Sequence, residues 1–269
     1  MNTSKCQQLV DSLLSRYKSP SSFENPFPNL KEIDNKKSGD IVLKTLTLKI
    51  KENKYKIDFG NIFVPENRNR MDSRLIPVPL IKWHALIKNP SKPILWLGSG
   101  IKSSSILRVE LKCLLKEIGW MLNHHDVVMV GYRGMEILLT ANHSEVQEVL
   151  KIENNPISCE DLKKLGNVFY SSFQKLKDEG IDLEGYNIFE IVDDLEEVRK
   201  GLRYQKINLF STDYGVILCY SYGLRYSEHI NQIFMGNSET PSYFLFKPDL
   251  FDLQLKYYSR LYNQNSHYI

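Results

Sequence analysis

Cysteine is scarce in this sequence, and the four cysteine residues lie far apart. Cys6, Cys113, Cys159 and Cys219 form no Cys-x-x-Cys pair among the 269 residues. A thiolate metal site needs ligands at short, paired spacings, and a disulfide framework needs a higher density of cysteine. The sequence therefore predicts reduced, mostly buried thiols, with no metal centre and no disulfide framework.

Long apolar runs and an excess of one charge are also absent. No stretch approaches the ~20 apolar residues that span a bilayer, and 35 basic against 32 acidic residues give a net charge of +3. No basic block interleaved with aromatic residues indicates nucleic-acid binding. The polar N-terminus lacks the apolar core of a secretory signal. We therefore expect a cytoplasmic protein that binds neither membranes nor nucleic acid, and no pattern indicates a cofactor.

The apolar residues suffice for one sizeable core. Their share is 42% of the chain, which suits one domain with small extensions. A stretch rich in Pro, Ser and Asn ends near Gly39 and separates an expected N-terminal helix from the rest. We predict an N-terminal helix and linker over residues 1–39, a core over 40–246, and a helical segment over 247–269.

Hydrophobic periodicity predicts a mixed sheet flanked by helices. A period near two indicates antiparallel strands early in the core, and apolar runs then alternate with helical patterns, as in parallel β–α units. The expected strands are 42–50, 54–64, 76–86, the start of 92–105, 126–130, 207–210 and 233–235. The expected helices are 7–17, 106–123, 158–176, 192–202, 216–225 and 248–262.

The segment Ile191–Gly215 is the most informative part of the chain. Apolar residues recur every three or four positions in its first half, which predicts a helix with one buried face. The run Ile207–Phe210 predicts a central strand that is covered on both faces. The next residues, Ser211–Gly215, leave that strand and enter another helical pattern. Small residues around a central polar one at such a corner are typical of a nucleophile elbow, here centred on Asp213.

These residues resemble the α/β-hydrolases, and within them the prolyl and tripeptidyl aminopeptidases, a group of serine peptidases. The family's segment reads approximately D-L-E-A-V-R-x-x-L-G-x-x-x-I-N-L-x-G-x-S-Y-G-G. This chain matches it at Asp194–Glu196, at Ile207–Leu209 and at Tyr214–Gly215. The resemblance implies an α/β-hydrolase fold, with a mostly parallel sheet, flanking helices and an N-terminal antiparallel hairpin. Asp213 occupies the position of the nucleophilic serine.

Two further segments resemble the same family. The run KPILWLGSGIKSSS is similar to its strand and oxyanion loop, which implies oxyanion-hole donors at Ser99 and Gly100, with Tyr214 after the elbow. An ordinary strand–loop–helix connection is the alternative. The turn Gly131–Gly134 resembles the family's D-x-R-G turn, and its Arg133 is either a ligand for a substrate carboxylate or a structural residue that organises the loop.

The resemblance implies a triad whose acid and histidine follow later strands. The chain ends at Ile269, soon after the strand expected at 233–235, so we expect a C-terminally truncated sheet whose edge a helix or a partner covers. The final helical segment resembles the start of the family's lid. Asp249, Asp252 and His267 have the order of a triad but not its context. The other histidines are expected to be structural or on the surface, and they are His84, His124, His125, His143 and His229.

Three functions remain open. A catalytically degenerate α/β-hydrolase would lack serine, acid and histidine, and would bind a small molecule or a peptide in its cleft. An active enzyme would use Asp213 as the nucleophile and attack carbon, as epoxide hydrolases and haloalkane dehalogenases do. A fragment of a longer aminopeptidase is the third possibility.

Overall fold

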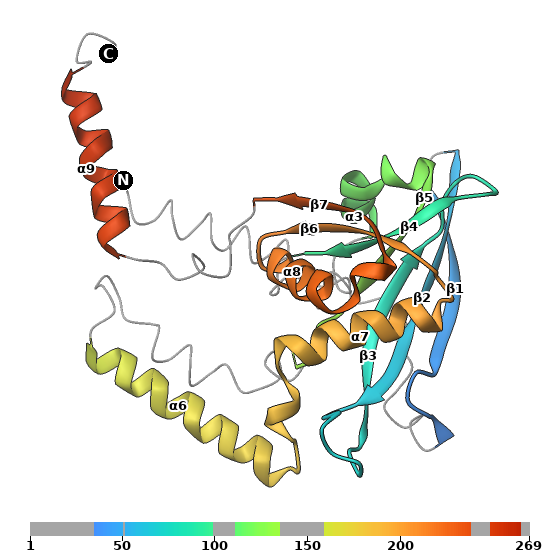
Figure 1. The fold of residues 1–269 in the computed structure, drawn as a ribbon, viewed down its shortest axis with the longest axis horizontal. Helices are drawn as coiled ribbons and strands as arrows, with labels where there is room; N and C mark the ends of the chain where they lie inside the picture. The colour runs from blue at the N-terminus through green and yellow to red at the C-terminus, as the bar shows by residue number, and fades with distance from the viewer. Residues whose placement is uncertain (1–34, 51, 99–110, 135–158, 238–247, 265–269) are drawn as a thin grey trace.

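A seven-stranded mixed sheet forms the centre of the computed structural model, which describes residues 35–50, 52–98, 111–134, 159–237 and 248–264 (Figure 1). The strand order is β1-β2-β3-β5-β4-β6-β7. The strands are β1 Ile41–Ile50, β2 Asn53–Pro65, β3 Leu75–Trp83, β4 Ser91–Leu97, β5 His125–Val130, β6 Ile207–Thr212 and β7 Ile230–Gly236. The α-helices are α3 Leu111–Ile118, α6 Cys159–Asp178, α7 Ile188–Gly201, α8 Tyr214–Tyr226 and α9 Pro248–Gln264. The predicted helix at 7–17 lies outside the described residues.

The antiparallel strands predicted in the first part of the core are confirmed. β1 pairs with β2, β2 with β3, and β3 with β5, each in antiparallel orientation. A Cβ added to Gly60 in β2 would lie 1.7 Å from the carbonyl oxygen of Val42 in β1. The close approach of these two strands therefore requires glycine at this position.

The parallel part of the sheet consists of β5, β4, β6 and β7. Helix α3 lies between β4 and β5 along the chain, α7 precedes β6, and α8 connects β6 to β7. Because these four strands are parallel, their C-terminal ends meet at one edge of the sheet, which we call the carboxyl edge. Their N-terminal ends form the opposite, amino edge. In open α/β sheets, ligands bind outside the carboxyl edge.

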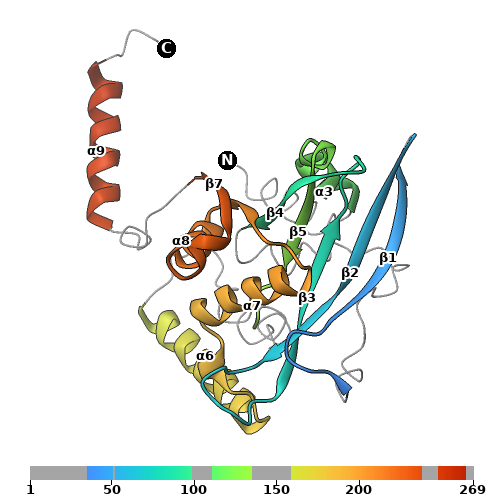
Figure 2. The same ribbon diagram turned by 45° about the vertical axis from the view of Figure 1, so that its right-hand side comes forward.

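Helices cover both faces of the sheet (Figures 1 and 2). On the first face, α7 and α8 pack over a core that includes Leu195, Leu209 and Leu218. On the second face, α3 packs over a core that includes Leu114 and Ile118. The layered mixed sheet confirms the predicted fold class, α/β with flanking helices and N-terminal antiparallel strands.

One detail of β6 differs from the prediction. Ile207, Leu209 and Ser211 are buried on the first face, but Phe210 on the second face is only partly buried. The expectation that both faces of this strand are fully covered is therefore wrong. The cause is that α3 packs over the β3, β5 and β4 side of the second face, and among the described helices none packs over β6 and β7 there.

Candidate functional site

Asp213 lies at the corner between β6 and α8, at the carboxyl edge. Its backbone has φ 51° and ψ −126°, a combination that a residue with a side chain rarely adopts and that stores strain. The side chain is exposed, and Asn237 Nδ2 donates a hydrogen bond to Asp213 Oδ1 at 2.5 Å. A strained strand-to-helix corner that projects one polar side chain is the geometry of a nucleophile elbow.

Gly215 permits the tightness of this corner. A Cβ at this position would lie 2.1 Å from the carbonyl oxygen of Leu97 in β4. The first turn of α8 therefore lies directly against the neighbouring strand, which only glycine allows. This contact gives a physical reason for Gly215 in the sequence.

Two tyrosines lie beside the elbow. Tyr132, which follows β5, donates a hydrogen bond from its hydroxyl to the carbonyl oxygen of Gly98 at 3.0 Å. Its ring lies 6.0 Å from that of Tyr214 between centroids. Burial raises the pKa of both tyrosine hydroxyls above the usual value of 10.0, so both are neutral phenols at pH 7. Of the predicted oxyanion-hole donors, Tyr214 begins α8, whereas Ser99 and Gly100 lie outside the described residues.

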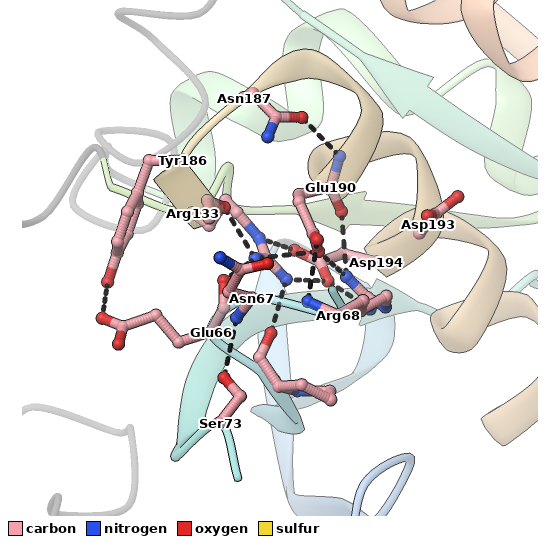
Figure 3. A network of polar contacts seen from close by, with 12 residues as sticks. Glu66, Asn67, Arg68, Ser73, Arg133, Tyr186, Asn187, Glu190, Asp193 and Asp194 are labelled. Carbon is pink, nitrogen blue, oxygen red and sulfur yellow. Dashed lines mark hydrogen bonds and ion pairs between the residues drawn. The ribbon is translucent and has the colours of Figure 1, made fainter. Parts of the chain in front are cut away.

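Arg133 is engaged entirely within the protein (Figure 3). Its side chain is 0% exposed, and all five N–H groups of its guanidinium donate. Nε and Nη2 bind the two carboxylate oxygens of Asp194, each at 2.6 Å. The remaining protons go to the backbone carbonyls of Pro65, Glu66 and Gly185. This arrangement leaves no N–H group of Arg133 for a substrate carboxylate. Of the two roles that the sequence left open, it favours the structural one.

The arginine belongs to a buried polar network that joins three segments. Arg68, from the loop after β2, reaches both Asp194 (2.7 Å) and Glu190 of α7. Asn187 is the N-cap residue of α7, and its Oδ1 accepts from the backbone N–H of Glu190 at 3.1 Å. Each charge in this set therefore has an opposite charge in contact, which is the condition under which buried ions are tolerated. We call Arg68, Arg133, Glu190 and Asp194 the arginine network.

The described histidines all lie at the amino edge, opposite Asp213. His84 follows β3, His124 and His125 stand at the start of β5, and His229 precedes β7. His84 Nε2 lies 2.6 Å from Asp58 Oδ2, and His229 Nε2 lies 3.6 Å from Glu196 Oε1. His143 and His267 lie outside the described residues, and Asp249 and Asp252 are exposed on α9.

Sequence reasoning missed two participants in this region. Asn237 directly follows β7, and Arg68 lies in the loop between β2 and β3. The signal for Asn237 was available, because polar residues just after parallel strands gather at the carboxyl edge. Arg68 offered no comparable signal, since its partner Asp194 is 126 positions away.

The described residues contain no cluster of three or more His, Cys, Asp or Glu side chains arranged to hold a metal ion. Within the same residues, no helix has both the length and the apolar character that crossing a membrane requires. The sheet, the helices on both of its faces and the elbow together define the α/β-hydrolase fold.

Comparison with known proteins finds only distant likenesses among solved structures. No protein family matches the sequence, and no curated protein matches it. A mutant epoxide hydrolase from Vigna radiata aligns with a TM-score of 0.29 and 11% identity, covering 72% of this chain and 38% of its own. A mutant epoxide hydrolase from Bacillus megaterium aligns with a TM-score of 0.30 and 20% identity, covering 59% of this chain and 38% of its own.

The protein Cfl2 from Burkholderia cenocepacia aligns with a TM-score of 0.37 and 8% identity, covering 74% of this chain and 47% of its own. This chain thus spans less than half the length of these three structures. The sheet and the elbow of this chain, rather than such distant likenesses, carry the assignment of its fold.

Proposed function

We propose that this chain is a hydrolase-fold protein without peptidase activity, in which the carboxylate of Asp213 binds a ligand at the carboxyl edge. One observation carries the proposal. The elbow is built as in a hydrolase, but it presents an exposed carboxylate, and every described histidine lies at the opposite edge. Acyl transfer needs a hydroxyl or thiol nucleophile with a base beside it, and a site without its triad retains little catalysis.

The chemistry of the carboxylate defines the ligand. Asp213 Oδ1 accepts from Asn237, and among the described residues none donates to Oδ2. An ionised carboxylate only accepts hydrogen bonds. The ligand is therefore a small molecule or a peptide that offers a protonated amine or another N–H donor to Oδ2.

A binding experiment with amino-acid amides tests this proposal. The amides carry a protonated amine and an N–H donor, and binding can be followed by NMR line broadening or calorimetry. We expect Asp213→Asn to weaken binding at least tenfold, because the asparagine side chain carries no charge to attract the ligand's protonated amine. The matched control is Asp72→Asn, which neutralises another exposed aspartate. Equal binding by both variants, or hydrolysis of an aminoacyl anilide by the wild-type chain, would contradict the proposal.

A second candidate function is favoured by the strain at Asp213. Strained backbone clusters at active sites, and a carboxylate can act as a nucleophile. In this reaction Asp213 Oδ2 attacks a carbon of an epoxide. A C–O ester bond forms, the ring C–O bond breaks, and the alkoxide takes a proton from water. No described histidine is placed to activate a water for ester hydrolysis, so the ester would accumulate.

Mass spectrometry of the chain after incubation with a small epoxide tests this second candidate. The expected product is one adduct of the epoxide's mass on the peptide that contains Asp213. The adduct should be absent from Asp213→Asn and present in Asp72→Asn. An unmodified wild-type peptide excludes the nucleophile role without affecting the binding proposal. The third possibility, a fragment of a longer aminopeptidase, stays a prediction that sequencing the transcript beyond Ile269 tests.

A further inference from the structure

A row of aromatic side chains lies on the second face of the sheet. Trp96 in β4 pairs in register with Phe210 in β6, and Phe210 pairs with Phe234 in β7. The rings of Phe210 and Phe234 stack with centroids 4.7 Å apart, and those of Trp96 and Phe210 lie 6.3 Å apart. Trp120, which follows α3, lies 6.4 Å from Phe210. We call these four residues the aromatic row.

The outer part of the aromatic row is open to solvent. Phe234 is 56% exposed and Trp120 is 63% exposed, although adjacent rings of this size normally lie in a core or an interface. Two neighbouring strands occupy ~10 Å across a sheet, which is about the diameter of one helix. The surface over β6 and β7, beside α3, is therefore wide enough for one helix, which would pack on the aromatic row.

Helix α9 has the pattern that such a position requires. Asp252, Lys256, Ser259 and Asn263 recur at helical spacing and form a polar side. Leucines and tyrosines occupy the other side, and among them Leu255 is 53% and Tyr258 is 56% exposed. The 17 residues of α9 extend over ~25 Å, and the 7 residues of β7 extend over ~23 Å. The helix and the strand thus match in length.

Helix α9 stands apart from the sheet in both views (Figures 1 and 2). A single helix of this length is marginally stable in water, and most helices depend on packing of their apolar side. The chain connects α9 to β7 through Asn237 and residues 238–247, and ten residues can reach ~33–36 Å. A tether of this length raises the local concentration of α9 at the aromatic row to the millimolar range, which favours the chain's own helix over one from another copy.

We propose that α9 docks its apolar side on the aromatic row of the same chain, with the helix axis aligned along β7 and beside α3. The docked helix shields Phe234 and Trp120 and covers the second face of β6 and β7. The proposal concerns a surface on one face of the sheet, so it does not depend on the role of Asp213 at the carboxyl edge.

Hydrogen exchange of the full chain tests the docking. The double variant Leu255→Ser with Tyr258→Ser removes apolar contacts, and Asp252→Ser with Lys256→Ser is the matched control on the polar side. We expect amide exchange in α9 to become at least tenfold faster in the first variant than in the second. Equal exchange in the two variants would overturn the proposal.

A change on the sheet separates docking from helix propensity. Phe234→Ser leaves the sequence of α9 intact, and its exposed position makes folding of the variant robust. We expect it to accelerate exchange in α9 as well, and unchanged exchange would overturn docking on the aromatic row. The Leu255→Ser, Tyr258→Ser variant should also increase acrylamide quenching of Trp120, while the buried Trp83 stays protected. A dimeric mass in light scattering that the same variant halves would overturn docking within one chain and assign the row to a second copy.

Discussion

Arg133 and Asp213 both lie at the carboxyl edge, but the charge of Arg133 is buried and that of Asp213 is exposed. Arg133 is fully buried with all of its donors bound, and it holds the loop after β2, the turn after β5 and helix α7 together. Asp213 is exposed on a strained corner, with Asn237 as its partner among the described residues. One charged group at this edge is thus bound within the protein, and the other is exposed to solvent.

Removing Arg133 should destabilise the protein far more than neutralising Asp213. Arg133→Met leaves Asp194 buried without the guanidinium that binds both of its oxygens. Removing one member of a buried ion pair costs ~3–5 kcal/mol, and urea denaturation measures this loss. Asp213→Asn should change stability by less than ~0.5 kcal/mol, as substitutions of exposed residues do. Comparable losses in both variants would show that the two sites do not differ in role.

Two glycines of α8 differ in the space around them. Gly215→Ala places a Cβ 2.1 Å from the Leu97 carbonyl oxygen, and overpacking of this kind costs ~1–3 kcal/mol. Gly223→Ala is the matched control, because its nearest neighbour would lie 3.9 Å away. In a helix interior this second change stabilises by up to ~1 kcal/mol. The melting temperature should therefore fall in Gly215→Ala and rise in Gly223→Ala. A shift in the same direction in both variants would contradict the close approach at the elbow.

The strain at Asp213 is itself measurable. Glycine adopts positive φ without penalty, so Asp213→Gly should stabilise the fold by about 1 kcal/mol relative to Asp213→Ala. Both variants remove the carboxylate, and their difference in unfolding free energy therefore reports the backbone alone. Equal stability of the two variants would mean that the corner is unstrained and would weaken the case for Asp213 as a nucleophile.

The sequence was sufficient for the elements and the corner, but not for the contacts between them. Periodicity located the strands that became β1, β2 and β5, and the position of Asp213 followed from the sheet-to-helix transition in the sequence. The contact of Arg68 with Glu190 was not predictable, because hydrophobic patterns say nothing of which charged side chains pair across 122 positions. Partial exposure of Phe210 was missed for a related reason, since it depends on how many helices cover one face.

Asp126 is a carboxylate at the amino edge that several groups of the protein bind. Burial alone would raise its pKa, but hydrogen bonds from the Ala85 N–H, Lys82 and Tyr204 outweigh it and lower the pKa below its usual 3.8. The unfolded chain then binds the proton more tightly, so Asp126 contributes stability at pH values above its unfolded pKa. That contribution disappears as the pH falls through the lower, folded pKa.

Urea midpoints measured at successive pH values below 5 test this expectation. The wild-type chain should lose stability more steeply on acidification than Asp126→Asn, whose amide does not titrate. Asp72→Asn, which changes an exposed aspartate, is the matched control. If Asp126→Asn follows the wild-type curve instead, the hydrogen bonds from Lys82 and Tyr204 do not favour the ionised form of Asp126.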